Sequence, residues 1–384
     1  ALACAVTYLR WLEGAGIPLA TPVNQVAMVL SVDADMFLSA AKLRAARLLW
    51  ARVQEAMDLT PAALKLHAEA SWRMMSRRDP HVNLLRATAA TFAAATAGAD
   101  SLTMLPFTSA IGLPDRFARR MARNVQLVLG EESHLGHVAD PAAGSGFMDG
   151  VAHEMATEAW RRFQEIEAAG GMIEALSGGI IQKQIAETKE ARAKNIAKRK
   201  DALTGVSEFP HLAETPADVL APLEAPAAPA ADTLMPYRLS EPFEALRDAS
   251  DQVTQTSGAR PKILLANLGS VADFTTRATW AANVFEAGGI EALQNDGFED
   301  GAAAAAAFAQ SDAEVAILCS SDEVYQAKAA EAAKALTEAG AKHVYLAGRP
   351  DNGLSAAGVG TFVYAGCDIL ALLNDAHALL GVAR

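Results

Sequence analysis

The glycine turn that follows the apolar run Ile263–Leu268 is the strongest candidate for a ligand site in this sequence. Gly269 ends the run, and an amphipathic pattern that includes Trp280 and Val284 begins near Thr275. A strand, a glycine turn and a helix start form the opening unit of a parallel α/β domain, where ligands bind at the carboxyl ends of strands. The chemistry to expect at such a turn is the binding of a phosphate or a nucleotide.

A second candidate is the motif DPAAGSG at Asp140–Gly146. After a strand, a turn of this kind holds S-adenosylmethionine in adenine-specific DNA methyltransferases. Those enzymes also need an Asn/Asp-Pro-Pro-Tyr/Phe element for the flipped base, and neither NPPY nor DPPY occurs in this chain. We therefore interpret the motif as a structural turn at the end of a strand.

Other polar groups are weaker candidates. His134 and His137 have the spacing of a metal-ligand pair, but they flank Gly136 and no third ligand is near them in sequence. His153–Glu154 lacks the second histidine of HExxH, which excludes that class of zinc hydrolase. Ser320–Ser321 follows an apolar run, so it either contacts a ligand or caps the next helix.

Residues 1–205 alternate between strand and helix patterns, which predicts a parallel sheet. Four strands are expected, at Val26–Val32, Leu64–Ala68, Ser101–Leu105 and His137–Ala139. One of the helices between them is predicted to bury Phe117, Met121, Val125 and Val128. Four such units make half of an eightfold barrel, which typically takes about 250 residues. A half barrel has two open edges, so either the other half lies upstream or the sheet is a smaller open one.

A run rich in proline and alanine at Pro210–Pro242 predicts an extended linker, with Pro226 and Pro229 among its prolines. A second domain is predicted to start at Pro261. Its expected strands are Ile263–Leu268, Gly289–Leu293, Val315–Cys319, His343–Ala347 and Thr361–Tyr364. Short strands with helices between them are typical of a flavodoxin-like, doubly wound sheet.

Composition narrows the function further. The 384 residues carry a formal net charge of −12, which argues against a nucleic-acid-binding protein. The 3 cysteines are far apart in sequence, which fits a reducing cytoplasm rather than a disulfide framework. No apolar run approaches the ~20 residues of a membrane span.

Several segments together resemble one family. They are KLRAARLLWARV (42–53), RRDPHVNLLRATAATFAAATAGADSL (77–102), LPDRFARRMARNVQLVLGEESHL (113–135), VADPAAGSGFMDG (138–150) and QEIEAAGGM (164–172). These segments resemble the methylmalonyl-CoA mutase family of adenosylcobalamin-dependent acyl-CoA mutases, in the family's order. The resemblance implies an α/β chain whose residues 1–209 form the C-terminal half of a (β/α)8 TIM barrel. It further implies a linker with a connecting helix at 210–258 and a cobalamin-binding-type, flavodoxin-like domain at 259–384.

The departures from the family's pattern fall on its cobalamin contacts. Catalytic members carry a D-x-H-x-x-G turn after the first strand of the cobalamin domain, and its histidine ligates cobalt. Aligned on Gly269, these three positions are Val271, Asp273 and Thr276 here. A carboxylate does not reproduce a neutral imidazole ligand. The later S-x-L and Gly-Gly elements are also altered, to Ser320-Ser321-Asp322 and to Gly348-Arg349-Pro350.

The segment that faces the substrate in catalytic members also departs from the family's pattern. The family's His-Thr-Asn segment is replaced by Thr103-Met104-Leu105-Pro106, which has no imidazole. Losses at both sites resemble the non-catalytic small subunit of the heterodimeric mutases. That resemblance implies a catalytic large subunit as partner, which would bind adenosylcobalamin and acyl-CoA. The alternatives are a catalytic acyl-CoA mutase that holds cobalamin without histidine, and a degenerate scaffold with no partner.

Overall fold

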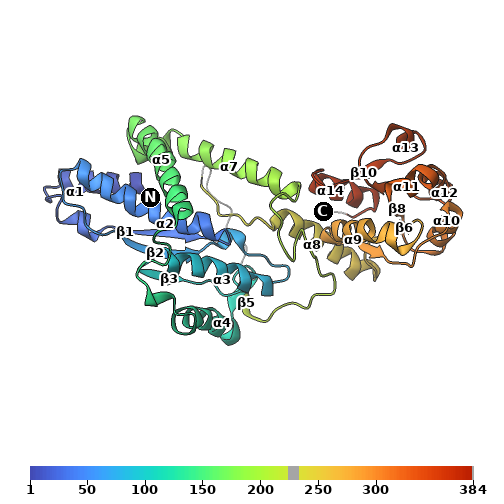
Figure 1. Cartoon of the computed structure of the whole chain (residues 1–384), viewed down its shortest axis with the longest axis horizontal. Helices are drawn as coiled ribbons and strands as arrows, with labels where there is room; N and C mark the ends of the chain where they lie inside the picture. Colours follow the sequence, from blue (N-terminus) through green and yellow to red (C-terminus); the bar gives the residue numbers. More distant parts are fainter. Residues whose placement is uncertain (224–232, 383–384) are drawn as a thin grey trace. The chain divides into compact units, whose positions relative to one another are not determined.

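The computed structural model describes residues 1–223 and 233–382 (Figure 1). The chain forms two compact units, and each is described by itself. The first comprises Ala1–Lys189 with Pro216–Arg238, and the second comprises Glu190–Thr215 with Leu239–Arg384. The linker prolines Pro226 and Pro229 lie outside the described residues. The domain boundaries expected at residues 209 and 258 remain predictions.

The first unit contains a parallel sheet of three strands in the order β1-β2-β3. The strands are β1 (Ala27–Val32), β2 (Lys65–Ala70) and β3 (Ser101–Thr103). The strand expected at His137–Ala139 is wrong, because Leu135–His137 forms a short 3-10 helix, η4. His134, with φ of +55°, turns the chain just before this segment, and the apolar run is too short to continue as a strand.

Helices α2 (Met36–Ala56) and α3 (His81–Thr96) pack against this sheet. The other helices of the unit are α1 (Leu2–Gly14), α4 (Arg116–Leu127), α5 (Gly146–Ala168) and α6 (Met172–Ser177). The helix α7 (Ile180–Ala197) follows them. Alternate residues of β2 (Leu66, Ala68 and Ala70) are buried with the alanine-rich face of α3, which places the core between sheet and helices. Two short antiparallel strands, β4 (Gly112–Pro114) and β5 (Val219–Pro222), also pair in this unit.

The buried face of α4 differs from the predicted one. Its buried residues are Ala118 and Ala122, while Phe117 and Val128 are exposed. Small side chains bring this helix close to its neighbours and leave the larger side chains at the margins. The apolar spacing therefore predicted the helix correctly but not the residues that it buries.

The second unit is built on a five-stranded parallel sheet in the order β10-β9-β8-β6-β7. Its strands are β6 (Lys262–Asn267), β7 (Glu291–Leu293), β8 (Val315–Cys319), β9 (His343–Ala347) and β10 (Thr361–Val363). Its helices are α8 (Glu241–Ser257), α9 (Val271–Ala287), α10 (Gly301–Gln310), α11 (Asp322–Val324), α12 (Ala330–Glu338), α13 (Asn352–Ala356) and α14 (Ile369–Leu379). A π-helical segment, η5 (Tyr325–Ala329), joins α11 to α12.

Both faces of this sheet are buried. Ile263 and Leu265 of β6 pack in the core formed with α9 and α14, whereas Leu264 and Ala266 pack in the core formed with α10 and α12. A strand that is buried on both faces reads as a continuous apolar run, as the sequence of β6 does. The chain is therefore an α/β protein with parallel sheets, as predicted.

Candidate functional site

The turn after β6 is closed by a capping box. Gly269 has φ of +88°, and a Cβ there would lie 2.9 Å from Oδ2 of Asp273. That Oδ2 accepts hydrogen bonds from the backbone N–H of Ser270 at 2.9 Å and from its hydroxyl at 2.7 Å. The hydrogen bond from the Ser270 hydroxyl, with the one from its backbone N–H, lowers the pKa of Asp273. Asp273 therefore acts as the carboxylate that starts α9.

The turn after β8 is held by buried hydrogen bonds. The Ser320 hydroxyl donates to the carbonyl oxygen of Leu268 at 2.6 Å. The backbone N–H of Ser320 donates to the Tyr325 hydroxyl at 2.9 Å. That hydroxyl oxygen also lies 2.9 Å from the carbonyl oxygen of Leu318 and 3.1 Å from that of Ala347. Tyr325 thus links the carboxyl ends of β8 and β9, and burial raises the pKa of its phenol.

Arg277 completes this edge of the sheet. Its guanidinium pairs with Asp322, with Nη2 and Oδ1 2.5 Å apart, and lies 4.9 Å from the centre of the Tyr325 ring. A Cβ built on Gly348 would lie 3.6 Å from Tyr325 Cε2 and 3.8 Å from Arg277 Nη1. We call the side chains of Arg277, Ser320, Asp322 and Tyr325 the edge cluster. They occupy the carboxyl edge beside Gly348, where the sequence predicts a ligand site.

The predicted site residues divide into two sets. Ser320, Asp322 and Gly348 meet through the edge cluster, whereas Val271 and Thr276 are exposed on α9. Sequence reasoning missed Arg277 and Tyr325. The sequence around Arg277 gave little signal, since its partner Asp322 is 45 residues away in sequence.

In the first unit, the uncovered face of the sheet carries its own polar row. The His67 ring has Nδ1 2.8 Å from the Ser101 hydroxyl and Nε2 3.2 Å from the Thr103 hydroxyl. The segment Thr103–Pro106, which begins at the end of β3, has no imidazole, whereas the neighbouring strand β2 carries His67. Each ring nitrogen of His67 thus has a hydroxyl partner on the neighbouring strand β3.

Comparison of the sequence with known proteins identifies its family. The family model described as methylmalonyl-CoA mutase matches residues 1–276. The chain belongs to the methylmalonyl-CoA mutase family. A methylmalonyl-CoA mutase small subunit from Streptomyces virginiae is 46% identical over 383 residues, covering 100% of this chain and 61% of that protein. The small subunit from Propionibacterium freudenreichii subsp. shermanii is 39% identical over 392 residues, covering 100% of this chain and 60% of that protein.

A Cereibacter sphaeroides methylmalonyl-CoA mutase is 33% identical over 216 residues, which is 56% of this chain and 30% of that protein. The matches to the small subunits from Streptomyces and Propionibacterium thus extend along the whole chain, whereas the match to the Cereibacter mutase covers only part of it. The chain spans about three fifths of the length of the small subunits from Streptomyces and Propionibacterium.

The mutase family uses adenosylcobalamin, and the residues at the carboxyl edge do not fit that cofactor. Asp273 stands where the resemblance to the family predicts the cobalt-ligating imidazole, and its carboxylate accepts hydrogen bonds from Ser270. The sequence contains no histidine between His211 and His343. Within the described residues, no group of three or more His, Cys, Asp or Glu side chains is placed to hold a metal ion.

The DPAAGSG turn has a structural role in this family member. The Asp140 carboxylate accepts two hydrogen bonds of 2.9 Å from Arg44 of α2, and the hydrogen bond from Arg44 lowers the pKa of Asp140. Ser145 caps α5 by accepting from the backbone N–H of Met148. The turn therefore joins α2 to the start of α5, as the structural interpretation expected, although no strand precedes it.

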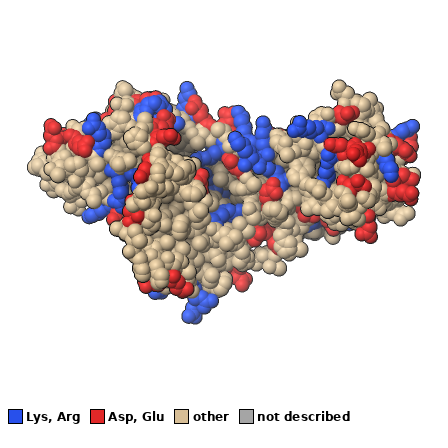
Figure 2. All heavy atoms as spheres, viewed as in Figure 1, with Lys and Arg blue, Asp and Glu red and all other residues tan. Residues whose placement is uncertain are grey.

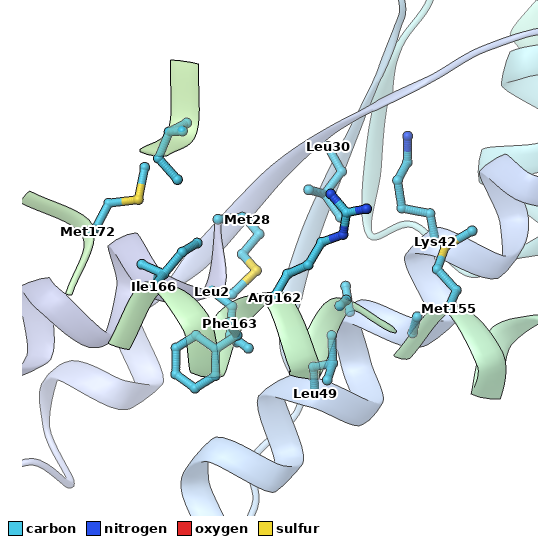
Figure 3. A pocket seen from close by; sticks show the side chains of 16 residues that line it. Leu2, Met28, Leu30, Lys42, Leu49, Met155, Arg162, Phe163, Ile166 and Met172 are labelled. Atoms are coloured by element: carbon cyan, nitrogen blue, oxygen red, sulfur yellow. The ribbon is translucent and has the colours of Figure 1, made fainter. Parts of the chain in front are cut away.

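The remaining candidates also lack a ligand set. The rings of His134 and His137 are stacked with their centres 4.4 Å apart, and both side chains are exposed. An apolar cavity of about 370 Å³ lies between α2, α5 and β1 (Figure 3). Its lining includes Met28, Phe163 and Ile166, with Lys42 and Arg162 as its only charged groups among the described residues. This lining has no residue pair suited to acid-base chemistry.

No helix of the described part of the chain is both long enough and apolar enough to cross a membrane.

Proposed function

We propose that this chain is part of the structural small subunit of a heterodimeric methylmalonyl-CoA mutase. In this proposal, a catalytic large subunit binds adenosylcobalamin and acyl-CoA and interconverts methylmalonyl-CoA and succinyl-CoA. The small subunit packs against the large one and stabilises it in the cytoplasm. The observation that carries the proposal is Asp273, which caps a helix where the catalytic members of the family place their cobalt ligand.

The finer fold assignment belongs to the same proposal. Three parallel strands, each followed by a helix, together with the α5 segment correspond to the C-terminal half of a (β/α)8 barrel. In the second unit, numbering the strands along the chain gives the order 2-1-3-4-5, which is that of flavodoxin-like sheets. The edge cluster lies where such sheets bind their ligands, and this supports a cobalamin-type domain that has lost its ligand.

In this proposal, side chains that fill the carboxyl edge account for the loss of cobalamin binding better than the replacement of the histidine ligand by Asp273 alone. Tyr325 is 5% exposed, and its ring and hydroxyl occupy the space between Gly348 and the ends of β8 and β9. Opening this space would break the hydrogen bond from Ser320 and would leave buried backbone groups without partners. Such groups cost about 1–3 kcal/mol each. Cobalamin could bind here only if its contacts outweighed the free-energy cost of these lost hydrogen bonds.

The test uses the full-length small subunit alone and in complex with its large subunit. We expect the small subunit alone to bind no adenosylcobalamin and to give no absorption spectrum of histidine-ligated cobalt. We expect the complex to show that spectrum together with mutase activity. Turnover of any acyl-CoA by the isolated small subunit would contradict the proposal and favour the catalytic alternative. Failure to associate with a large subunit would favour a scaffold without a partner.

A further inference from the structure

The two parallel sheets have four edge strands between them, and β1 differs from the other three. Its sequence AMVLSV has 6 residues without a charge or a proline, and its one neighbour within the described residues is β2. The other edge strands, β3, β7 and β10, have 3 residues each. Native proteins keep edge strands short or cover them, because a long apolar edge pairs with other strands. We therefore expect β1 to have a second neighbour in the native protein.

The register of β1 shows which of its backbone groups are open. The backbone N–H of Ser71 donates to the carbonyl oxygen of Val32 at 2.7 Å, and the register pairs Val32 with Ala70 of β2. Alternate residues of a parallel strand bond to the same neighbour, so Met28 and Leu30 face β2 as Val32 does. The N–H and C=O groups of the residues between them point to the open edge. These residues are Ala27, Val29 and Ser31.

An apolar groove of about 820 Å³ lies beside this edge, between β1 and α1. No side chain of its lining within the described residues carries a charge. Tyr8 and Trp11 of α1 are each 58% exposed there, with ring centres 5.9 Å apart, and Val29 of β1 is 62% exposed. In Figure 2 the surface at the left end of the view, where Figure 1 draws α1, is mostly uncharged. Exposed aromatic side chains in an apolar groove indicate a surface that another segment covers.

The order of the elements indicates which segment covers the groove. The helix α2 connects β1 to β2, and α3 connects β2 to β3, so each joins two neighbouring parallel strands. Such a helix is the crossover of a βαβ unit. The helix α1 leads into β1 in the same way and contacts α2. This arrangement predicts that α1 is the crossover from a strand that pairs with the open edge of β1.

The small-subunit relatives are long enough to supply such a strand. The chain covers 61% of the Streptomyces protein and 60% of the Propionibacterium protein, which leaves about two fifths of each outside the match. A segment of the same subunit is present at a high effective concentration beside the groove, whereas a separate chain must first associate. An edge that only a separate chain covered would be exposed whenever the small subunit is free.

We propose that the groove and the open edge of β1 form an interface inside the small subunit, covered by a part of that subunit which lies outside this chain. A strand of that part pairs with the backbone of Val29 and Ser31, and apolar side chains next to it cover Tyr8 and Trp11. The inference rests on the proposed function only in that the chain is part of a small subunit. It also excludes this surface from the contacts with the large subunit.

The experiment measures amide hydrogen exchange, with single-residue resolution across β1, in the full-length small subunit alone and in complex with its large subunit. The N–H groups of Val29 and Ser31 report on the open edge. Those of Met28 and Leu30, which face β2, are the matched control on the same strand. In the free small subunit we expect the edge groups to exchange about a hundredfold or more slowly than in an unstructured peptide, as the control groups do. Addition of the large subunit should leave these rates unchanged.

A pair of substitutions tests the part that α1 plays. Y8S/W11S in the full-length small subunit should speed exchange at Val29 and Ser31 about tenfold or more, because it removes apolar contacts that hold the covering segment. The matched control is L85S, since Leu85 of α3 is 68% exposed and does not line the groove. This control should leave exchange in β1 unchanged. Equal exchange rates in the two variants would overturn the role of α1.

Fast exchange at Val29 and Ser31 in the free small subunit would overturn the proposal. If addition of the large subunit then slowed that exchange, the large subunit would be the occupant of the groove. If exchange slowed as the concentration of the small subunit rose, the occupant would be a second copy. Failure of the small subunit to associate with a large subunit would overturn the proposed function, whereas exchange in the small subunit alone would still test the interface.

Discussion

Polar side chains occupy two regions of the molecule: the carboxyl edge of the sheet in the second unit and the uncovered face of the sheet in the first unit. The side chains in these two regions differ in burial. At the edge, Ser320 and Tyr325 are buried and bond to strand ends. On the uncovered face, Lys65, Glu69 and Thr103 are exposed, and His67 is partly so. The polar side chains at the edge are therefore bonded to groups of the protein, whereas those on the uncovered face are accessible to solvent.

This difference is consistent with the structural role that we propose for the chain. At the edge, the groups that would contact a ligand instead hold the turns that precede α9 and α11. On the uncovered face, nothing in the described residues packs over the polar row. Stability is therefore expected to depend strongly on the edge cluster and weakly on the polar row of β2 and β3.

The largest expected effect is at Tyr325. Replacing it with alanine leaves a cavity among Gly348, Arg277 and the strand ends, and it removes the acceptor of the Ser320 N–H. We expect Tyr325→Ala to lower the free energy of unfolding of the second unit by about 3–5 kcal/mol. Tyr325→Phe keeps the ring and should lose about 1–2 kcal/mol. Urea unfolding followed by circular dichroism measures both values.

A loss below about 1 kcal/mol for Tyr325→Ala would show that the edge is not tightly packed. Stabilisation of Tyr325→Ala by added adenosylcobalamin, absent in the wild type, would show that Tyr325 alone excludes the cofactor. The expected result is no such stabilisation, because Asp273 and Arg277 still occupy their positions.

An intermediate effect is expected at Asp273. Its replacement by alanine removes the capping box and should destabilise the second unit by less than Tyr325→Ala does. The folded-state pKa of Asp273 is lowered, so its stabilising contribution is present above its unfolded pKa and is lost as the pH falls through the folded value. The stability difference between wild type and Asp273→Ala should therefore narrow below about pH 4.

Thermal unfolding at neutral and acid pH tests this dependence. Glu331→Ala is the control, because Glu331 is an exposed carboxylate of α12 with no recorded partner. A difference that stays constant to low pH would mean that the Asp273 carboxylate contributes nothing to the cap. Asp273→His adds a further check, since we expect it to produce no spectrum of histidine-ligated cobalt.

Local patterns in the sequence were sufficient to find the parallel strands. The sequences of β6 and β8 are continuous apolar runs because both faces of these strands are buried. The sequence of β2 alternates between apolar and polar residues because only one of its faces is buried. The pairing of β4 with β5 was not foreseen, because it joins Gly112 to Pro222 across more than a hundred residues. The strand expected at His137–Ala139 was wrong because a three-residue segment with two apolar residues is too short to show a strand pattern.

The site was predictable only in part, for a related reason. The family's motif positions led to Asp273, Ser320 and Gly348 from sequence alone. What fills the edge depends on Arg277 and Tyr325, whose partners come from other turns and helices. A tyrosine in a helical pattern gives no signal that its hydroxyl reaches the ends of two strands.

The smallest expected effect is at His67. The ring is partly exposed and bonds to two hydroxyls on the uncovered face, so His67→Ala should change the free energy of unfolding by about 0.5 kcal/mol or less. The matched control is Leu66→Ala on the buried side of the same strand, where Leu66 is 1% exposed and a loss of about 2–5 kcal/mol is expected. Urea unfolding of both variants gives the two values on one scale. Similar losses for the two variants would mean that the polar row is packed as tightly as the core, and the contrast between the two regions would then be wrong.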